Sequence, residues 1–414
     1  MARKKLEQRE IAILRLIYCG ANYSRLDIAR KTGLSPALIT GIVRKLIGRN
    51  LVIEAPAVSL SVGRKPIPLE VRPDAGYFIG LDIGSYYSHI VVTDMPGQIV
   101  YREQVETEIA EGRVRVLKRA FECVRRAIAD SAAARRRILG MGIAHSGVID
   151  AGKGVVLSFP RPGQIAEWKD VPLRAIFEKE FRLPCVVVDS VRAKATAEGH
   201  LGLGRGVDNF LFVDAGMGIG AALFFEGKLY RGGGGNAGEF GHITVAENGP
   251  LCSCGNNGCL ESVASCAAII EAGRLAIERG VDSRIRDLAR GDLNRISVEV
   301  IAQAAAENDS LALRILQEAS SYIGRGLADL VNLLNPRLII FGGALFRAAP
   351  QLLADSLGRI IRQRSIEKLA NDVQLHVSPL GVEAGALGAS RITADRALTG
   401  LYLQTVHPDE TPVM

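Results

Sequence analysis

Residues 238–261 have the sequence GEFGHITVAENGPLCSCGNNGCLE, in which one histidine and three cysteines fall close together. Cys252, Cys254 and Cys259 lie within eight residues, and His242 precedes the first of them by ten. Three thiolates and one imidazole are typical ligands of tetrahedral zinc, so the spacing predicts a Cys₃His zinc site. Four protein ligands leave no position for water, which indicates a structural metal. The alternative is a group of buried, reduced thiols.

The length and the distribution of cysteines bound the class of protein. A chain of 414 residues is too long for one hydrophobic core and predicts two or three domains. The other four cysteines, Cys19, Cys123, Cys185 and Cys266, occur singly in apolar segments, as expected of thiols in a reducing compartment. The N-terminus has no apolar signal-peptide core, and no run of about 18 uncharged apolar residues occurs. We therefore expect a soluble, cytoplasmic protein without a membrane segment.

Positive charge is concentrated in the first 75 residues. This segment holds fourteen Lys or Arg against six Asp or Glu, a surplus of eight, whereas the whole chain has a formal charge of +7. The remaining residues are therefore almost neutral together. A basic head on a neutral body predicts a polyanionic partner for the head.

The head has the sequence pattern of a helix-turn-helix. An amphipathic helix is expected over residues 7–19, followed by a short helix that Ser24 and Asp27 open as a capping box. Ser35 then caps a third helix with Pro36 at its first position. The apolar residues of this third helix recur with helical spacing, so its other side faces outward and would enter the DNA major groove.

Two short strands at residues 51–54 and 67–71 predict a wing that follows these helices. The wing tip would place two basic residues against phosphate or in the minor groove. The predicted DNA-contacting residues are Ser35, Ala37, Leu38, Thr40, Gly41, Arg44, Lys45, Arg64 and Lys65. The alternative is a protein-interaction module whose charges are only solvated, but the coincidence of charge, caps and turn favours DNA.

The body contains an internal repeat. Residues 78–84 (FIGLDIG) and 210–216 (FLFVDAG) are each a buried apolar strand that ends in Asp-x-Gly and precedes a second strand, which predicts two related α/β halves. Further strands are expected at residues 138–144, 185–188, 338–341 and 373–377, and helices at residues 113–131, 173–181, 192–199, 262–278, 298–307, 311–334 and 385–393. Glycine turns on both sides of a cleft would suit the phosphates of a nucleotide, although each turn could also simply end its strand.

Together, GEFGH, CSCGNNGCLE, the basic head and the Asp-x-Gly repeat resemble the ROK family of repressors, open reading frames and kinases. Within it, the chain resembles the winged-helix repressors of the xylose-repressor and N-acetylglucosamine-repressor type. The resemblance covers nearly the whole chain and implies an α/β, actin-like (ribonuclease H-like) two-lobed sugar-kinase fold behind a winged helix-turn-helix. The implied domains are the winged helix at 1–75, a first α/β lobe at 76–191 completed by a C-terminal helix at about 385–396, and a second lobe at 192–384 with the zinc motif.

The resemblance also implies roles for single residues. In the family a structural zinc is held by one histidine and three cysteines, which correspond here to His242, Cys252, Cys254 and Cys259. Family kinases contact sugar hydroxyls through the counterparts of Glu239, His242 and Glu261, and all three are present. The sequence thus retains the ligand-recognition set of the family.

The kinase machinery is not retained. The first phosphate turn of the family, D-x-G-G-T-K, is DIGSYY at residues 82–87, so the threonine hydroxyl and the lysine charge are lost. The second turn, G-T-G, is GMG at residues 216–218. The catalytic aspartate of the family stretch N-D-x-N-A aligns with Ser190, and a serine cannot accept the proton of a sugar hydroxyl near neutral pH. We therefore expect no enzymatic activity.

Two residues beside Ser190 are candidate effector contacts. Asp189 lies one residue early; at the end of a strand its side chain would face away from that of Ser190 and would bind a hydroxyl better than it would replace the base. Arg192 stands where the family has asparagine and introduces a cation beside the expected sugar pocket. It would suit a carboxylate or phosphate of the ligand, or else pair with a structural acid.

The resulting hypothesis is a sequence-specific DNA-binding transcriptional regulator, a repressor, whose body senses a sugar or sugar derivative without phosphorylating it. It would bind a double-stranded operator as a homodimer or tetramer. Two alternatives stay open: an active sugar kinase with an appended DNA-binding domain, and a DNA-binding repressor that a protein partner controls.

Overall fold

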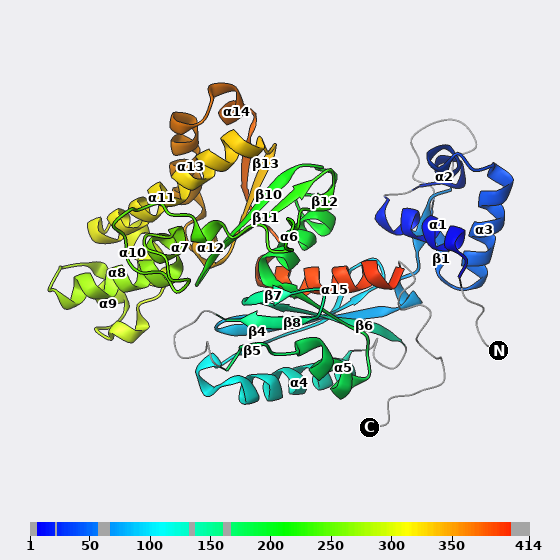
Figure 1. The fold of residues 1–414 in the computed structure, drawn as a ribbon, viewed down its shortest axis with the longest axis horizontal. Helices are drawn as coiled ribbons and strands as arrows, with labels where there is room; N and C mark the ends of the chain where they lie inside the picture. The colour runs from blue at the N-terminus through cyan, green and yellow to red at the C-terminus, as the bar shows by residue number, and fades with distance from the viewer. Residues whose placement is uncertain (1–5, 21–22, 57–66, 132–136, 160–166, 399–414) are drawn as a thin grey trace. The chain divides into compact units, whose positions relative to one another are not determined.

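The computed structural model describes residues 6–20, 23–56, 67–131, 137–159 and 167–398 (Figure 1). The chain forms two compact units. The first consists of residues up to Leu157, Asp170–Ala193 and the residues from Gly385 onward. The second consists of Ser158–Lys169 and Lys194–Ala384. Within the described ranges, no helix is long and apolar enough to cross a membrane.

The head of the first unit is a cluster of three helices with a two-stranded wing. The elements are α1 (Gln8–Cys19), α2 (Arg25–Thr32), α3 (Pro36–Gly48), β1 (Val52–Glu54) and β2 (Leu69–Val71), and the two strands pair antiparallel. The predicted caps are confirmed, because Ser24 Oγ accepts a hydrogen bond from Asp27 N and Ser35 Oγ accepts one from Leu38 N. The four apolar residues that recur along α3 are all buried: Ile39, Ile42, Val43 and Leu46.

A five-stranded mixed sheet forms the rest of the first unit. Its order is β5 (Ile99–Glu106), β4 (Tyr87–Asp94), β3 (Tyr77–Ile83), β6 (Ile138–His145) and β9 (Cys185–Asp189). The pairs of β4 with β3 and β5 are antiparallel, and those of β6 with β3 and β9 are parallel. Helices α4 (Arg113–Asp130) and α5 (Leu173–Phe181) cover one face and α15 (Ala384–Leu398) the other (Figure 1). Smaller elements are η1 (Pro73–Ala75), η2 (Ile109–Glu111), β7 (Val148–Asp150) and β8 (Val155–Ser158).

The C-terminal helix α15 packs unusually close to this sheet. A Cβ at Gly80 on β3 would lie 1.9 Å from the carbonyl oxygen of Ala386, and a Cβ at Gly142 on β6 would lie 2.0 Å from that of Ala389. Glycine at these two strand positions therefore lets the backbone of the helix rest on the backbone of the sheet. Helix α15 is thus an integral part of the first unit.

The second unit repeats this sheet. Its order is β12 (Lys228–Leu229), β11 (Ile219–Phe225), β10 (Phe210–Ala215), β13 (Leu338–Gly342) and β14 (Gln374–Val377), with the same sequence of antiparallel and parallel pairs. The predicted internal repeat is therefore confirmed, and the body has the actin-like two-lobed fold. The apolar face of β10 and β13 packs on a large helical core in which α11 is central.

Helices supply most of the second unit. They are α6 (Ser190–Leu201), which begins in the first unit, α7 (Leu260–Ala264), α8 (Cys266–Glu278), α9 (Arg284–Leu288), α10 (Val298–Ala306), α11 (Ser310–Leu334), α12 (Ala344–Ala348), α13 (Pro350–Arg364) and α14 (Glu367–Asp372), with the short turns η3 (Phe240–His242), η4 (Leu293–Arg295) and η5 (Gly381–Glu383). The single helix expected over residues 262–278 is wrong. Ser265 is extended there and caps α8 by accepting a hydrogen bond from Ala268 N, so the chain bends between α7 and α8.

Candidate functional site

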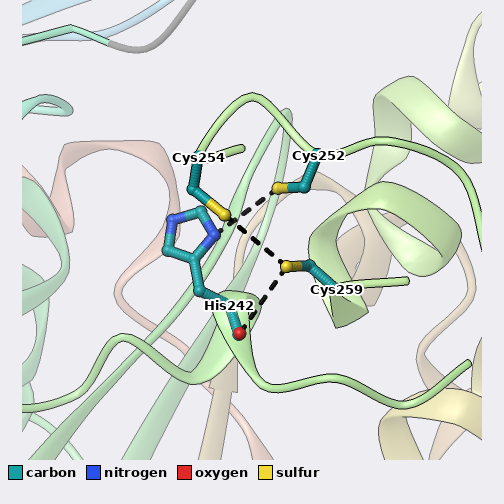
Figure 2. Close-up of side chains that lie close together, drawn as sticks. All are labelled: His242, Cys252, Cys254 and Cys259. Carbon is teal, nitrogen blue, oxygen red and sulfur yellow. Dashed lines mark hydrogen bonds between the residues drawn. The ribbon is translucent and has the colours of Figure 1, made fainter. Parts of the chain in front are cut away.

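Four side chains with metal-binding atoms converge in the second unit (Figure 2). His242 ends η3, Cys252 and Cys254 lie in the loop that follows, and Cys259 is the N-cap of α7. Nδ1 of His242 lies 3.6 Å from Sγ of Cys252, and the Sγ atoms of Cys254 and Cys259 lie 3.6 Å apart. All four ligand atoms fall within 4.8 Å of one another. The structure therefore brings the four expected ligands together.

The two separations of 3.6 Å fit a small tetrahedral metal. Zinc bonds of about 2.3 Å to sulfur and about 2.0–2.1 Å to nitrogen would put neighbouring ligand atoms about 3.5–3.8 Å apart. Cys252 and Cys259 are buried, whereas Cys254 is exposed. Burial of apolar thiols therefore does not account for the whole cluster, and the donor set fits zinc better than it fits a patch of core cysteines.

The loop that carries the cysteines is shaped by its backbone. Gly258 N donates a hydrogen bond to Pro250 O at 2.9 Å, and Val245 N donates to Gly258 O at 2.9 Å. Gly258 has a φ of 65°, and a Cβ there would lie 1.6 Å from the carbonyl oxygen of Ala246. Only glycine can hold this position, which explains the glycine next to the last cysteine.

The two glutamates expected to contact an effector lie beside the cluster. Nε2 of His242, the ring nitrogen not next to Cys252, lies 4.0 Å from Oε2 of Glu239. The Glu239 side chain is 57% exposed, so its carboxylate remains open to solvent. Glu261 Oε2 instead accepts a hydrogen bond from Ile219 N at 2.9 Å, which joins α7 to the start of β11. One imidazole thus adjoins both the cysteines and an exposed carboxylate.

Ser190 is bonded to the aspartate of the first Asp-x-Gly turn. Its Oγ donates to Oδ1 of Asp82 at 2.8 Å, and both side chains are buried. Helix α6 begins at Ser190 rather than at residue 192, and Asp189 Oδ1 accepts a hydrogen bond from Arg192 N at 3.0 Å, as a helix-capping carboxylate does. Sequence reasoning missed the bond between Asp82 and Ser190, which are 108 residues apart.

The five predicted effector contacts are divided between the two units. Asp189 and Arg192 belong to the first unit, and Glu239, His242 and Glu261 belong to the second. Arg192 is buried, whereas Glu239 is exposed. That all five contact one effector stays a prediction.

The aspartate of the second Asp-x-Gly turn also has a partner inside the protein. Asp214 is the next-to-last residue of strand β10, and its Oδ2 lies 2.9 Å from Nζ of Lys194 on α6. The side chains of Asp214 and Lys194 are 12% and 21% exposed. Lys194 was not singled out from the sequence, although it lies one helical turn after Ser190. At the first turn, the rings of Tyr86 and Tyr87 are exposed. Helix α6 thus supplies a partner to each aspartate.

The outward side of α3 is accessible in the head. Of the predicted DNA contacts, Ser35, Ala37, Gly41, Arg44 and Lys45 are exposed, and Leu38 and Thr40 are half-buried. Thr40 Oγ1 donates to Pro36 O at 2.8 Å, which engages its hydroxyl within the helix. Lys45 Nζ lies 3.3 Å from Oε1 of the buried Glu10 on α1, whereas Arg44 makes no ion pair with the part of the chain that the structure describes. Arg64 and Lys65 lie outside the described residues.

Comparisons with known proteins cover nearly the whole chain. The xylose repressor of Caldicellulosiruptor bescii is 31% identical over 92% of this chain and 93% of its own length. The DNA-binding transcriptional dual regulator NagC of Escherichia coli strain K12 is 27% identical over 95% of this chain and 94% of its own. Both relatives therefore include a counterpart of the head as well as of the body.

Among solved structures, a regulator matches nearly the whole chain, whereas a kinase matches about three quarters of it. A ROK family transcriptional regulator, a homologue of the Escherichia coli MLC protein, has a TM-score of 0.79 and 29% identity and covers 96% of this chain and 97% of its own. A ROK family glucokinase from Streptomyces griseus, solved with glucose and AMPPNP, has a TM-score of 0.67 and 30% identity and covers 77% of this chain and 99% of its own. The model of the ROK family matches residues 78–396, both α/β sheets and the cysteine loop included, and the chain belongs to the ROK family.

Proposed function

We propose that this protein is a DNA-binding transcriptional regulator, a repressor, whose kinase-like body responds to a sugar or sugar derivative. The observation that carries the proposal is the basic winged helix, which a relative named a xylose repressor and one named a DNA-binding transcriptional dual regulator match together with the body along more than nine-tenths of the chain. The exposed side of α3 presents Arg44 and the N-terminal turn at Ser35 to a major groove. Such a regulator acts in the cytoplasm, beside the DNA.

The body is proposed to recognise its ligand without phosphorylating it. A kinase needs a general base at the sugar hydroxyl, and loss of such a base typically lowers the rate by about 10²–10⁴. Ser190 stands at that position and its hydroxyl is bonded to Asp82. The other aspartate of the repeat, Asp214, is neutralised by Lys194. Both findings support recognition without turnover.

We further propose that His242, Cys252, Cys254 and Cys259 hold a structural zinc ion. When bound, the metal would complete a four-ligand shell and fix the cysteine loop, with no position open for chemistry. Through Nδ1, the ring of His242 would be held in place, and its Nε2 would remain directed toward Glu239. The loop would thereby orient Glu239, His242 and Glu261, the three predicted effector contacts that lie in the same unit.

The regulator is proposed to bind DNA as a homodimer. Two recognition helices that read one operator must lie roughly one helical turn of DNA, about 34–36 Å, apart. An effector that changes the spacing of two heads therefore changes operator affinity without touching the DNA contacts. A tetramer would satisfy the same requirement in pairs.

Retention of genomic fragments by the full-length protein tests this function. Fluorescence anisotropy should then give a saturable affinity that weakens steeply as salt rises, because phosphate contacts release counterions. D-xylose and N-acetylglucosamine, the sugars in the names of the relatives, are the first effector probes. In parallel, a coupled assay for ATP-dependent phosphorylation of both sugars should stay at background.

Three outcomes would contradict part of the proposal. If the protein retained no DNA fragment at low salt, the regulator assignment would be wrong. If it phosphorylated a sugar at a rate that Glu239→Ala abolished, the protein would be a kinase with an appended head. If DNA binding were confirmed but calorimetry with sugars stayed silent at millimolar concentration, a protein partner would be the controlling ligand.

A further inference from the structure

The hydrophobic core of the head is continuous with the end of α15. One cluster of buried residues joins α1, α2, α3 and the wing to Ala394, Ala397 and Leu398 of α15 and to Leu139 of β6. The head therefore does not sit on a free linker in this unit. It shares its core with α15, which contacts α1 across 372 residues of sequence.

A charged contact sits at this junction. The guanidinium carbon of Arg391 lies 3.9 Å from the centre of the Tyr18 ring, and its Nε donates to Oδ1 of Asp395 at 3.1 Å. Arg391 is 6% exposed and Tyr18 is 9% exposed. A cation over an aromatic face is worth most when both groups are removed from water. Tyr18 Oη has no hydrogen-bond partner among the described residues, so the ring, and not the hydroxyl, carries the contact.

The other end of α15 meets the aspartate that is bonded to Ser190. A Cβ at Gly385 would lie 1.9 Å from Oδ2 of Asp82, so the first turn of the helix rests on this carboxylate. Between the two ends, Ser390 Oγ and Thr93 Oγ1 are 2.5 Å apart in the sheet interface. Gly385 and Arg391 are about 9 Å apart along the axis of one helix. A displacement at Asp82 therefore has a short, rigid path to the head.

We propose that α15 couples the body to the DNA-binding head and that Arg391 is the positioning residue at the joint. The Arg391–Tyr18 contact fixes the orientation of α1, and with it that of the recognition helix α3. A shift of α15 at its Asp82 end would rotate the whole head as one rigid unit. The proposal rests on the proposed function only in naming DNA as the ligand of the head.

Four variants of the full-length protein separate this role from a general loss of stability. Arg391→Ala and Tyr18→Leu remove the contact, whereas Arg391→Lys keeps the cation and Tyr18→Phe keeps the ring. Hydrogen exchange needs neither DNA nor effector, and amides of α1 should exchange about tenfold faster in the first pair and at the wild-type rate in the second. Exchange in the second unit should not change in any of them.

Operator binding supplies the second measurement. On a fragment retained by the wild type, Arg391→Ala should bind about tenfold more weakly and lose most of its response to D-xylose, and Arg391→Lys should restore both. Wild-type exchange of α1 in Arg391→Ala, or faster exchange in Tyr18→Phe than in Tyr18→Leu, would overturn the proposed joint. Unchanged operator affinity in Arg391→Ala would overturn the coupling. If the wild type bound no DNA, the proposed function would fall, and the exchange data would still decide whether the joint exists.

Discussion

The buried carboxylate of Asp82 accepts a hydrogen bond from Ser190, the residue predicted to correspond to the catalytic base of family kinases. A serine at this position cannot accept a proton and instead donates a hydrogen bond to the carboxylate. Lys194 likewise pairs with the carboxylate of Asp214, and it carries a positive charge. Both aspartates thus hold α6 against a strand end, although Oδ1 of Asp214 is buried and has no hydrogen-bond partner among the described residues.

The bond between Ser190 and Asp82 should stabilise the first unit measurably. Ser190→Ala leaves a buried carboxylate oxygen without its donor, which costs about 1–3 kcal/mol of the free energy of unfolding. Urea unfolding followed by circular dichroism measures the loss. Ser253→Ala, an exposed serine in the cysteine loop, is the control and should stay within about 0.5 kcal/mol of the wild type. Equal stabilities of the two variants would contradict the role given to this bond.

Because His145 is buried, we predict that the free energy of unfolding falls in mild acid. His145 ends β6, and complete burial lowers its pKa to about 3 from the usual 6.5. Between these two values the unfolded chain binds a proton that the folded chain does not, so the free energy of unfolding falls as the pH falls. The slope due to this group is about 1.4 kcal/mol per pH unit.

Urea titrations at pH 7, 6 and 5 test the contribution of His145. Gly147 N donates to Nδ1 of this ring at 2.9 Å, so His145→Asn retains an acceptor and removes the titrating group. The variant should show a shallower dependence of stability on pH below about 6.5. A pH dependence equal to that of the wild type would mean that other groups cause the acid sensitivity.

At the scale of elements, α3 and the cysteine loop owe their shapes to different forces. Helix α3 is specified locally, by a capping serine, a proline at its first position and an apolar stripe. The cysteine loop is specified by close backbone contacts that exclude any side chain at Gly258. Helix α3 should therefore tolerate substitutions on its outer side, whereas the cysteine loop should not tolerate a side chain at Gly258.

Two neighbouring basic residues on α3 should behave differently. Arg44→Ala removes an exposed cation without an ion-pair partner in the described residues, so it should weaken operator binding by about tenfold and reduce the salt dependence by about one phosphate contact. Lys45→Ala should weaken binding less and destabilise the head more, because Lys45 lies 3.3 Å from the buried Glu10. Fluorescence anisotropy at several salt concentrations and thermal unfolding distinguish the two effects. The reverse order in affinity would contradict the orientation assigned to these side chains.

Gly258→Ala should disrupt the cysteine loop. The added Cβ would meet the carbonyl oxygen of Ala246 at 1.6 Å, whereas at Gly255, which also has a positive φ, it would meet nothing within 4 Å. Both variants carry backbone strain of the order of 1–2 kcal/mol, and only the first adds a clash with the backbone. Metal content after purification in zinc should therefore fall much further in Gly258→Ala. Comparable losses in both variants would show that conformation, and not close packing, sets the requirement for glycine.

At the scale of the whole molecule, the same sheet topology occurs in both units, and each unit adds different elements to it. The first unit joins it to the DNA-binding head through α15, and the second adds the cysteine loop and a large helical core. The family match covers the body, and the regulators match the head as well. The same architecture thus carries catalysis in a glucokinase with nucleotide and sugar bound and regulation in relatives with a head.

Removal of metal should act on the second unit and leave the head intact. We expect about one zinc per chain, measured by atomic emission, and its extraction by a chelator should lower the melting temperature and speed hydrogen exchange around α7 and β11. Cys254→Ser should reproduce the effect, whereas Cys19→Ser, an exposed thiol outside the cluster, should not. Full exchange protection without metal would refute a structural role for the cluster.

Much of the fold and part of the site could be predicted from the sequence, because the signals are local. Capping serines, a helical stripe, an Asp-x-Gly strand repeat and a ten-residue histidine–cysteine spacing each act within one or two elements. The break at Ser265 could not be predicted, because its extended backbone interrupts a pattern that continues with helical period.

What the sequence by itself determined is therefore the winged helix, the repeated α/β architecture and the four residues of a cluster that could hold a metal ion. Only the tertiary structure decided the partners of individual polar groups: Asp82 with Ser190 across 108 residues, Asp214 with Lys194, and Tyr18 of the head with Arg391 of α15. The physical reason is that hydrogen bonds and ion pairs depend on distances of a few ångströms, which arise only when distant elements pack. Periodicity and spacing along the chain predict where a helix or strand forms, but they do not predict which distant residue its polar groups will contact.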